Sequence, residues 1–235
     1  MACPEKWPKD LPPDLQELKR RQEELARALV FRPLGFEPEI VGGADVSYLP
    51  EGRALGVIVV YHVKEKRLLS VASACLPVSF PYVPGFLSFR EVPVLKEAAR
   101  RLEVWPQVLL VDGQGILHPR RFGLACHLGL ELALPTVGVA KKPLVGEFEL
   151  PSSQAGSFTY IKVNGEVRGV ALRTRKGVKP VYISPGHLID LPSALAVVKS
   201  SLSGYRLPEP LRLAHLMTQR LKKDGGGDHS GRRGR

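Results

Sequence analysis

The sequence predicts an α/β protein built on one mixed β-sheet. Closely spaced runs rich in β-branched residues come first, and later runs alternate with segments of helical periodicity. The short and fully apolar run 108–111 is typical of a strand in the middle of a sheet. A chain of 235 residues can bury a substantial core, so we expect a single domain over 1–223. The Gly-rich, basic segment 224–235 is expected to be a disordered tail.

The first half predicts a helix, three strands and a second helix. A capping box that begins at Asp14, followed by a stripe of leucines, predicts a helix over 14–30. A segment dense in Pro and Gly, 80–86, precedes a helix expected near 92–103. Between the two helices, three β-rich runs indicate an antiparallel meander: 40–48, 54–63 and 67–77.

The second half predicts alternating strands and helices with an added hairpin. Pro119 marks the start of one helix, and Asn164-Gly165 is a strong signal for a tight hairpin turn. In chain order we expect a strand at 108–111, a helix at 120–133 and a strand at 136–140. A hairpin of 157–163 with 167–174, a strand at 180–184 and helices at 191–203 and 209–223 follow.

The composition excludes several classes of protein. No apolar run approaches the roughly 18 residues that a membrane-spanning helix needs. The first residues lack the apolar core of a secretory signal. The three cysteines are scattered, which supports neither a disulfide framework nor a cysteine zinc site. We therefore expect a cytoplasmic protein.

The charge is positive and uneven. The chain has 34 Lys and Arg against 23 Asp and Glu, a formal net charge of +11. Residues 1–117 are neutral overall, and the whole excess lies from residue 118 onward. Such an excess predicts a polyanionic partner, either nucleic acid or an anionic membrane surface.

Carboxylates lie where strands rarely carry charge. Asp45 is within a run of small and apolar residues, and Asp112 directly follows 108–111. Each alone is most simply a hydrogen-bonded turn or cap residue. If the two strands are neighbours, however, both carboxylates meet at one sheet edge, where they suit Mg²⁺ and metal-assisted phosphodiester hydrolysis. Glu91, just ahead of the expected helix, is the third candidate acid. The alternative is a glutamate whose only role is to interact with the dipole at the helix N-terminus.

The segment 112–118 also has the strand, Gly-x-Gly and helix pattern of a dinucleotide-binding loop. His118 occupies the third glycine position, and Asp112 would repel a pyrophosphate. No acidic residue follows the strand expected at 136–140. We therefore favour a loop whose glycines, Gly113 and Gly115, let a substrate backbone approach the acidic edge.

Five motifs in collinear order closely resemble the endonuclease V family: 43–48 (GADVSY), 81–85 (PYVPG) with 89–91 (FRE), 112–115 (DGQG) with 118–123 (HPRRFG), 138–143 (GVAKKP) and 183–187 (ISPGH). The resemblance spans about residues 42–215. It implies a ribonuclease H-like mixed sheet of order 3-2-1-4-5, flanked by helices, with a β-hairpin insertion. It also implies a Mg²⁺-dependent nuclease, with Mn²⁺ as a substitute, that recognises deoxyinosine (deaminated adenine) in DNA. Such enzymes hydrolyse the second phosphodiester bond 3′ to the lesion and leave a 3′-hydroxyl and a 5′-phosphate.

Carried over by position, the resemblance implies a metal site of Asp45, Glu91, Asp112 and His215. His215 lies in an expected helix without a flanking motif, so a surface or packing histidine is an equal alternative. Lys141 follows a strand that leads to the same edge and is placed to offset transition-state charge. The predicted catalytic residues are therefore Asp45, Glu91, Asp112 and Lys141.

The nucleic acid is expected to contact loops around this edge. Tyr82, on a loop stiffened by prolines, is predicted to enter the base stack, with a core tyrosine as the alternative. Residues just before the helix expected at 120–133 are predicted to hold the phosphate backbone. The complete predicted set is Tyr82, Pro84, Gly85, Gly113, His118, Arg120, Arg121, Lys142 and Gly186.

Alternative functions remain open from the sequence: an inosine-specific endoribonuclease on the same scaffold, and a lesion-binding module that does not cut. The carboxylates argue against the second, because acids beside phosphate are repulsive without a metal ion. We expect inosine-containing DNA as the partner, with single-stranded DNA or RNA as further candidates. No membrane partner is expected, and a monomer is the simplest assembly.

Overall fold

Eight strands form one mixed sheet of order β3-β2-β1-β4-β5-β8-β7-β6. The structure is a computed structural model and describes residues 15–224. Its strands are β1 Ile40–Leu49, β2 Arg53–His62, β3 Arg67–Pro77, β4 Val108–Val111, β5 Thr136–Ala140, β6 Phe158–Val163, β7 Glu166–Leu172 and β8 Val181–His187. Its helices are α1 Leu15–Arg27, α2 Leu87–Ala99, α3 Leu124–Leu132, α4 Leu191–Ser200 and α5 Glu209–Lys223, and a short 3-10 turn, η1 Pro50–Gly52, links β1 to β2.

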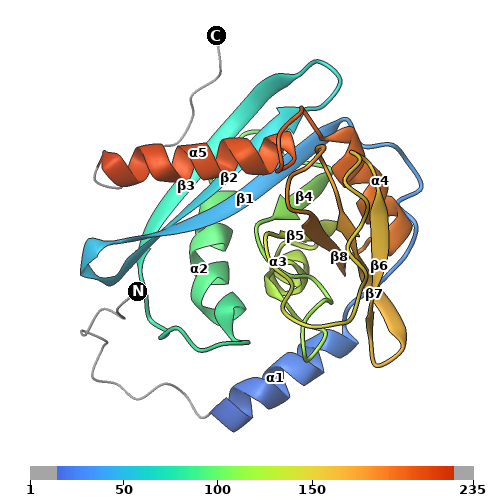
Figure 1. Cartoon of the computed structure of the whole chain (residues 1–235). Coiled ribbons are helices and arrows are strands. Elements are labelled where there is room, and N and C mark those ends of the chain that lie inside the picture. Colours follow the sequence, from blue (N-terminus) through green and yellow to red (C-terminus); the bar gives the residue numbers. More distant parts are fainter. Residues whose placement is uncertain (1–14, 225–235) are drawn as a thin grey trace.

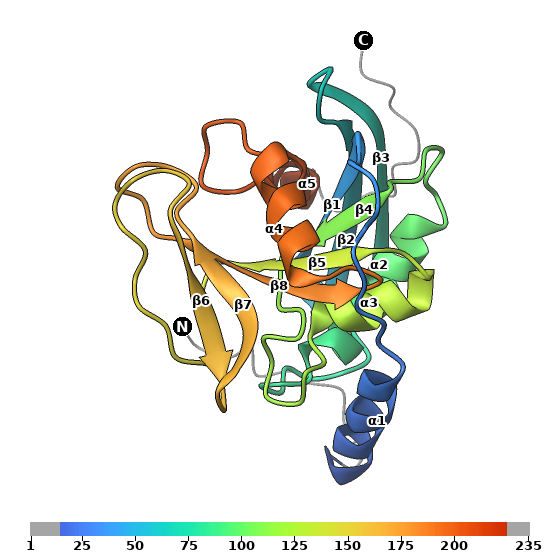
Figure 2. The same ribbon diagram turned by 90° about the vertical axis from the view of Figure 1, so that its right-hand side faces the viewer.

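Helices cover both faces of the sheet. In Figures 1 and 2, α4 and α5 lie on one face and α2 and α3 on the other. Apolar residues of the central strands fill both layers; Leu110 faces the α4 and α5 side and Leu109 faces the α2 and α3 side. Helix α1 lies outside these two layers; its Leu25, together with Leu29 just after its end, packs against a small cluster that includes Phe122. The central strands are therefore buried on both faces, as their continuous apolar runs predict.

The predicted order 3-2-1-4-5 is confirmed. Strand β1 pairs antiparallel with β2 and parallel with β4. In the parallel pair Ala44 lies opposite Val111, so Asp45 and Asp112 occupy adjacent positions one residue further on. The predicted hairpin forms strands β6 and β7 and extends the same sheet beyond β8.

Two predicted helix starts are wrong. Helix α2 begins at Leu87 rather than near residue 92, so Glu91 lies inside the helix and not ahead of it. Its sequence obscures this because Pro93, which normally interrupts a helix, sits within α2. Helix α3 begins at Leu124 rather than at residue 120, because Arg121 has a left-handed backbone (φ 55°) and Gly123 is the N-cap.

The other boundaries differ less. Helix α1 ends at Arg27, α4 ends at Ser200, and β8 continues to His187 instead of ending at residue 184. The proposed cap Asp14 and nearly all of the tail expected at 224–235 lie outside the described residues. Within residues 15–224, no helix is long and apolar enough to cross a membrane.

Candidate active site

Two aspartates meet where β1 runs past the end of β4. Asp45 is 8% exposed in the middle of β1, and Asp112 follows the last residue of β4. The backbone N–H of Asp112 donates to the carbonyl of Ala44 at 3.0 Å, which continues the parallel ladder and sets the two residues side by side. The sequence argument required these two strands to be neighbours, and this adjacency is confirmed.

Helix α5 brings a histidine to the same place. His215 Nδ1 lies 3.0 Å from Asp45 Oδ2, and the Thr218 hydroxyl donates to that oxygen at 2.9 Å. The helix can approach this closely because β1 has a glycine beneath it. A Cβ atom on Gly43 would lie 2.2 Å from the backbone of Pro210. The small residues of β1 therefore set the distance between α5 and Asp45.

Glu91 reaches the acids from the opposite helix layer. It is 7% exposed, and its Oε1 accepts a hydrogen bond from the Tyr48 hydroxyl at 2.8 Å. Burial, assisted by the charges of Asp45 and Asp112, raises the pKa of Glu91 to about 7, against the opposing effects of Tyr48 and Arg90. Near neutral pH this carboxyl therefore exists in both its protonated and its ionised form.

Lys141, directly after β5, forms an ion pair with Asp112. Burial raises the pKa of Asp112 above its usual range, and the Asp45 charge adds to this; Lys141 and His215 oppose the shift. The site thus contains several carboxyls in a poorly solvated space, with one ammonium to balance them. A bound cation would relieve the remaining repulsion.

The donor set fits a divalent metal ion. Asp45, Asp112 and His215 each offer one ligand atom, and these atoms all lie within 4.8 Å of one another. Two carboxylates with an imidazole, completed by water and phosphate oxygens, suit Mg²⁺ or Mn²⁺. Glu91 is outside this group but lines the same cavity of about 260 Å³, as do Lys141 and Gln219.

A second cavity adjoins the acidic one. It has a volume of about 420 Å³, and Leu87 lines both cavities. A volume of this size falls in the range of about 300–1,000 Å³ that small-molecule pockets occupy. Six of the residues predicted to bind nucleic acid line it: Tyr82, Pro84, Gly85, Gly113, His118 and Lys142. Tyr82 is 59% exposed, so it is not a core tyrosine.

Three other predicted residues lie elsewhere. Arg120 donates to the carbonyl of Gly85 and to the side chain of Gln22 and so is engaged inside the protein. Arg121 pairs with Glu166 at the end of the β6–β7 hairpin. Gly186 is buried in β8; a Cβ atom there would lie 2.3 Å from the Thr136 hydroxyl, and it lines neither cavity.

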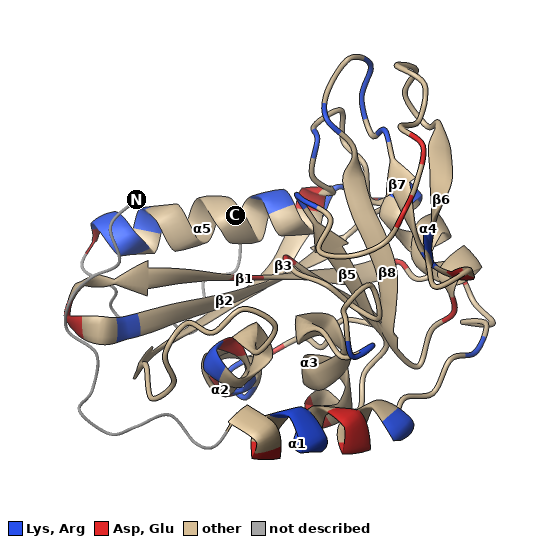
Figure 3. Cartoon of the chain, turned by 60° about the horizontal axis from the view of Figure 1, so that its bottom comes forward, with Lys and Arg blue, Asp and Glu red and all other residues tan. Residues whose placement is uncertain are grey.

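Part of the basic excess lies beside Lys141. Several Lys and Arg positions lie on the loops near β6, β7 and β8, whereas residues of both signs alternate along α1 (Figure 3). Arg175, Lys176 and Lys179 are exposed on the loop between β7 and β8. Arg206 donates to the carbonyls of Lys141 (2.8 Å) and Lys179 (3.0 Å), which ties this loop to the acidic cavity.

Sequence reasoning missed several residues of the site. Tyr48 and Thr218 bind the carboxylates of Glu91 and Asp45, and Leu87 separates the two cavities. One signal was available, because Thr218 follows His215 by three residues and therefore shares its helix face. Tyr48 ends the motif 43–48, but nothing in the sequence indicates its contact with Glu91 or the position of Leu87.

Comparison with known proteins decides the family. The model of the family described as Endonuclease V matches residues 23–216. The chain belongs to the endonuclease V family. It is 46% identical over 211 residues to the endonuclease V of Geotalea uraniireducens, with 90% of each chain covered. The chain is thus an endonuclease, and membership in the family implies the use of a divalent metal ion.

Solved endonuclease V structures share the fold. That of Streptomyces avermitilis is 38% identical, with a TM-score of 0.86 over 94% of this chain and 98% of its own. That of Ciona intestinalis, in complex with a 24mer DNA containing an inosine followed by a ribo-adenosine, is 28% identical, with a TM-score of 0.76 over 89% and 98%. A family member with this fold therefore binds an inosine-containing strand.

Proposed function

We propose that the chain is a Mg²⁺-dependent DNA repair endonuclease that recognises deoxyinosine and hydrolyses the second phosphodiester bond 3′ to it. The observation that carries the proposal is the pair of adjoining cavities. One, the acidic cavity, is lined by Asp45, Glu91, Asp112, Lys141 and His215. The other, the base cavity, contains Tyr82 and has a volume that suits a nucleobase. The base cavity would then hold the inosine while the acidic cavity cuts a bond further along the same strand. This separation is what cleavage 3′ to the lesion requires.

Recognition begins with removal of the base from the stack. Tyr82 is exposed on a loop that Pro81 and Pro84 stiffen, and it lines the base cavity. Such an aromatic side chain can fill the space left by a nucleotide turned out of the helix, at an unstacking cost of a few kcal/mol. Gly85 and Gly113 have no side chain that would keep the edge of the base away, and at this edge inosine has an oxygen at position 6 and a proton on N1.

Hydrolysis requires an in-line water, neutralised charge on the phosphorus and a leaving 3′-oxygen. The divalent ion, when bound by Asp45, Asp112 and His215, supplies Lewis-acid stabilisation of the phosphate. Lys141 holds Asp112 in place and adds a positive charge beside the reacting phosphate. Glu91, whose pKa is about 7 in the metal-free protein, lines the same cavity and can accept a proton from the attacking water. The P–O3′ bond breaks, and the leaving O3′ takes a proton from solvent, which gives a 3′-hydroxyl and a 5′-phosphate.

The basic loops supply affinity without reading sequence. Lys142 lines the base cavity next to Lys141, and the loop with Arg175, Lys176 and Lys179 is tied to Lys141 through Arg206. Contacts from such side chains to phosphates position a strand and weaken as salt concentration rises. We place the strand 3′ to the lesion along this basic surface.

An inosine-specific endoribonuclease is the second candidate. The Ciona intestinalis structure contains a ribo-adenosine after the inosine, so a ribonucleotide occurs in a strand bound by a family member. Contacts to the 2′-hydroxyl decide between the two sugars. A cytoplasmic location and a monomeric state stay predictions from the sequence.

The proposal is tested on end-labelled strands of DNA and RNA that differ only by inosine or adenosine at one position. Wild-type protein with Mg²⁺ should cut the inosine DNA at the second bond 3′ to the lesion, and chelator should stop the reaction. The products should be extendable by a polymerase and ligatable. Cutting that continues in chelator, or that ignores inosine, would overturn the proposal; faster cutting of RNA would favour the endoribonuclease.

A further inference from the structure

The carbonyl oxygen of Gly85, at the end of the loop 81–85, receives hydrogen bonds from several segments. Arg120 donates through Nη2 at 2.6 Å, and Gln22 donates through Nε2 at 3.0 Å. His118 Nε2 lies 3.1 Å from the same oxygen, and it carries the proton because Nδ1 accepts from the backbone N–H of Arg120. Three donors therefore converge on one backbone atom of the loop that presents Tyr82.

Gln22 is the part of α1 that reaches this point. Within α1, all of which the structure describes, only Gln22 is buried. Its Oε1 accepts from Arg120 Nε at 2.5 Å, while its Nε2 donates to Gly85 and lies 3.4 Å from the carbonyl of Phe122. Both ends of the amide are engaged by the protein. Gln22 lines the base cavity, but its polar atoms hold the wall of the cavity and are not left for a ligand.

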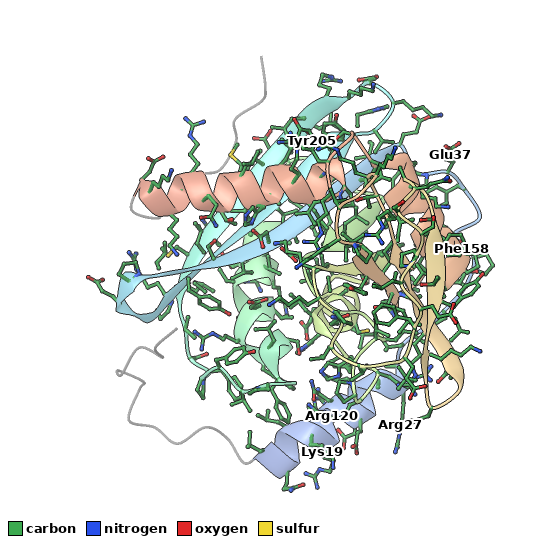
Figure 4. The ribbon with its side chains drawn as sticks, in the orientation of Figure 1. Lys19, Arg27, Glu37, Arg120, Phe158 and Tyr205 are labelled. Carbon is green, nitrogen blue, oxygen red and sulfur yellow. The ribbon has the colours of Figure 1, made fainter. Side chains whose placement is uncertain are left out.

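The guanidinium of Arg120 links α1 to the loop. It lies 4.4 Å above the ring of Phe86, and a Cβ atom on Gly85 would lie 2.8 Å from Nη2. Gly85 has a left-handed backbone (φ 83°), a conformation that favours glycine. Figure 4 shows Arg120 beside α1. The prolines stiffen the loop internally, whereas these contacts set its orientation relative to the cavity.

We propose that Gln22 is a positioning residue for the loop 81–85. By holding Gly85 and Arg120, it keeps Tyr82 at the mouth of the base cavity and so sets the discrimination between inosine and ordinary purines. The family match begins at residue 23, one residue after Gln22. The role of Tyr82 in this inference rests on the proposed function, whereas the anchoring of the loop does not.

The anchoring is tested by amide hydrogen exchange without nucleic acid. Gln22→Met keeps the length of the side chain and removes both hydrogen bonds. The Phe86 N–H donates to Val83 within the loop at 3.0 Å and reports its opening. Its exchange should accelerate about 10-fold in Gln22→Met, because, of the two lost hydrogen bonds, the one to Gly85 holds the loop directly. Leu25→Ala, which weakens the packing of the same helix, is the matched control and should leave this amide unchanged. Equal exchange in wild type and Gln22→Met, or equal acceleration in both variants, would overturn the inference.

The effect on discrimination is tested by the ratio of single-turnover cleavage rates on inosine and guanosine strands. Gln22→Met should lower this ratio by a factor of about 10 to about 100. The upper value corresponds to the loss of rate, about 100-fold, that a misplacement of about 1 Å causes in an oriented reaction. In a Tyr82→Ala background the same substitution should lower it no further. An equal fall in both backgrounds would mean that Gln22 acts by general stability and would refute its positioning role. A wild type that cuts neither strand would overturn the proposed function, while the exchange result would still decide whether Gln22 anchors the loop.

Discussion

Replacing Glu91 by glutamine separates the stability of the acidic cavity from its chemistry. Glu91→Gln is nearly isosteric, and the amide oxygen can still accept from Tyr48, which lies 2.8 Å away. The substitution removes a charge that burial, Asp45 and Asp112 all disfavour. We expect the variant to lose cleavage, because it can no longer accept a proton, and to gain stability at neutral and higher pH.

The size of the gain follows from the pKa of Glu91. A rise from 4.5 to about 7 corresponds to about 3 kcal/mol. Between these two values the folded protein binds more protons than the unfolded chain, so stability falls as pH rises through this window and then stays constant. Relative to wild type, Glu91→Gln should therefore gain up to about 3 kcal/mol between about pH 4 and about pH 8.

Other buried groups make the free energy of unfolding rise with pH, and this effect cancels when wild type and Glu91→Gln are compared. Burial lowers the pKa of His118 and of His127 from 6.5 to about 4. Their neutral forms are favoured in the folded protein, so the stability that they contribute is complete above about pH 6.5 and is lost as pH falls towards about 4. Both histidines are present in wild type and in Glu91→Gln, so their contribution cancels in the difference between the two proteins.

The assay is urea unfolding of both proteins, in chelator, at a series of pH values. Equal m-values would show that the substitution leaves the surface exposed on unfolding unchanged. The difference in unfolding free energy should grow with pH and level off above about pH 7. A difference that is independent of pH would refute the reasoning, since it would mean that Glu91 has the same pKa in the folded and unfolded states.

Three further predictions concern neighbouring groups. Tyr82→Ala should chiefly weaken discrimination between inosine and normal bases, measured as the ratio of cleavage rates; an unchanged ratio would remove Tyr82 from base recognition. Tyr48→Phe deletes the hydrogen bond that lowers the pKa of Glu91, so the fall in metal-free stability should move to higher pH; a constant midpoint would show that the bond has no effect. Mg²⁺ at about 100 times its dissociation constant should stabilise the wild type by about 2.7 kcal/mol. Asp45→Ala should lose this gain in a thermal melt, and equal stabilisation of both proteins would place the ion elsewhere.

The centre of the fold and the acidic pair could be predicted from local sequence. The apolar run 108–111 has no polar face, so it had to be a central strand, and a carboxylate directly after it had to lie at the sheet edge. Asp45 stood out because it interrupts a strand of small residues. The motifs then supplied the strand order that brings the two together, and the register of β1 and β4 agrees with it.

Contacts between distant segments could not be predicted in this way. Because Pro93 lies inside α2, the sequence did not indicate that the helix begins at Leu87 and contains Glu91. Arg120 and Arg121 were expected to hold phosphate because they lie near the N-terminus of an expected helix, yet they bond to Gly85 and Glu166. Such partners depend on how helices and loops dock, which periodicity and composition do not encode.

The central claim is that one cavity recognises inosine and the adjoining one cuts the strand. The most direct test is the binding of Asp112→Ala to inosine and adenosine duplexes with Ca²⁺ in place of Mg²⁺, alongside its cleavage of the inosine duplex with Mg²⁺. We expect cleavage to be abolished while the preference for inosine in binding is retained. Continued cleavage, or loss of the preference together with the activity, would contradict it.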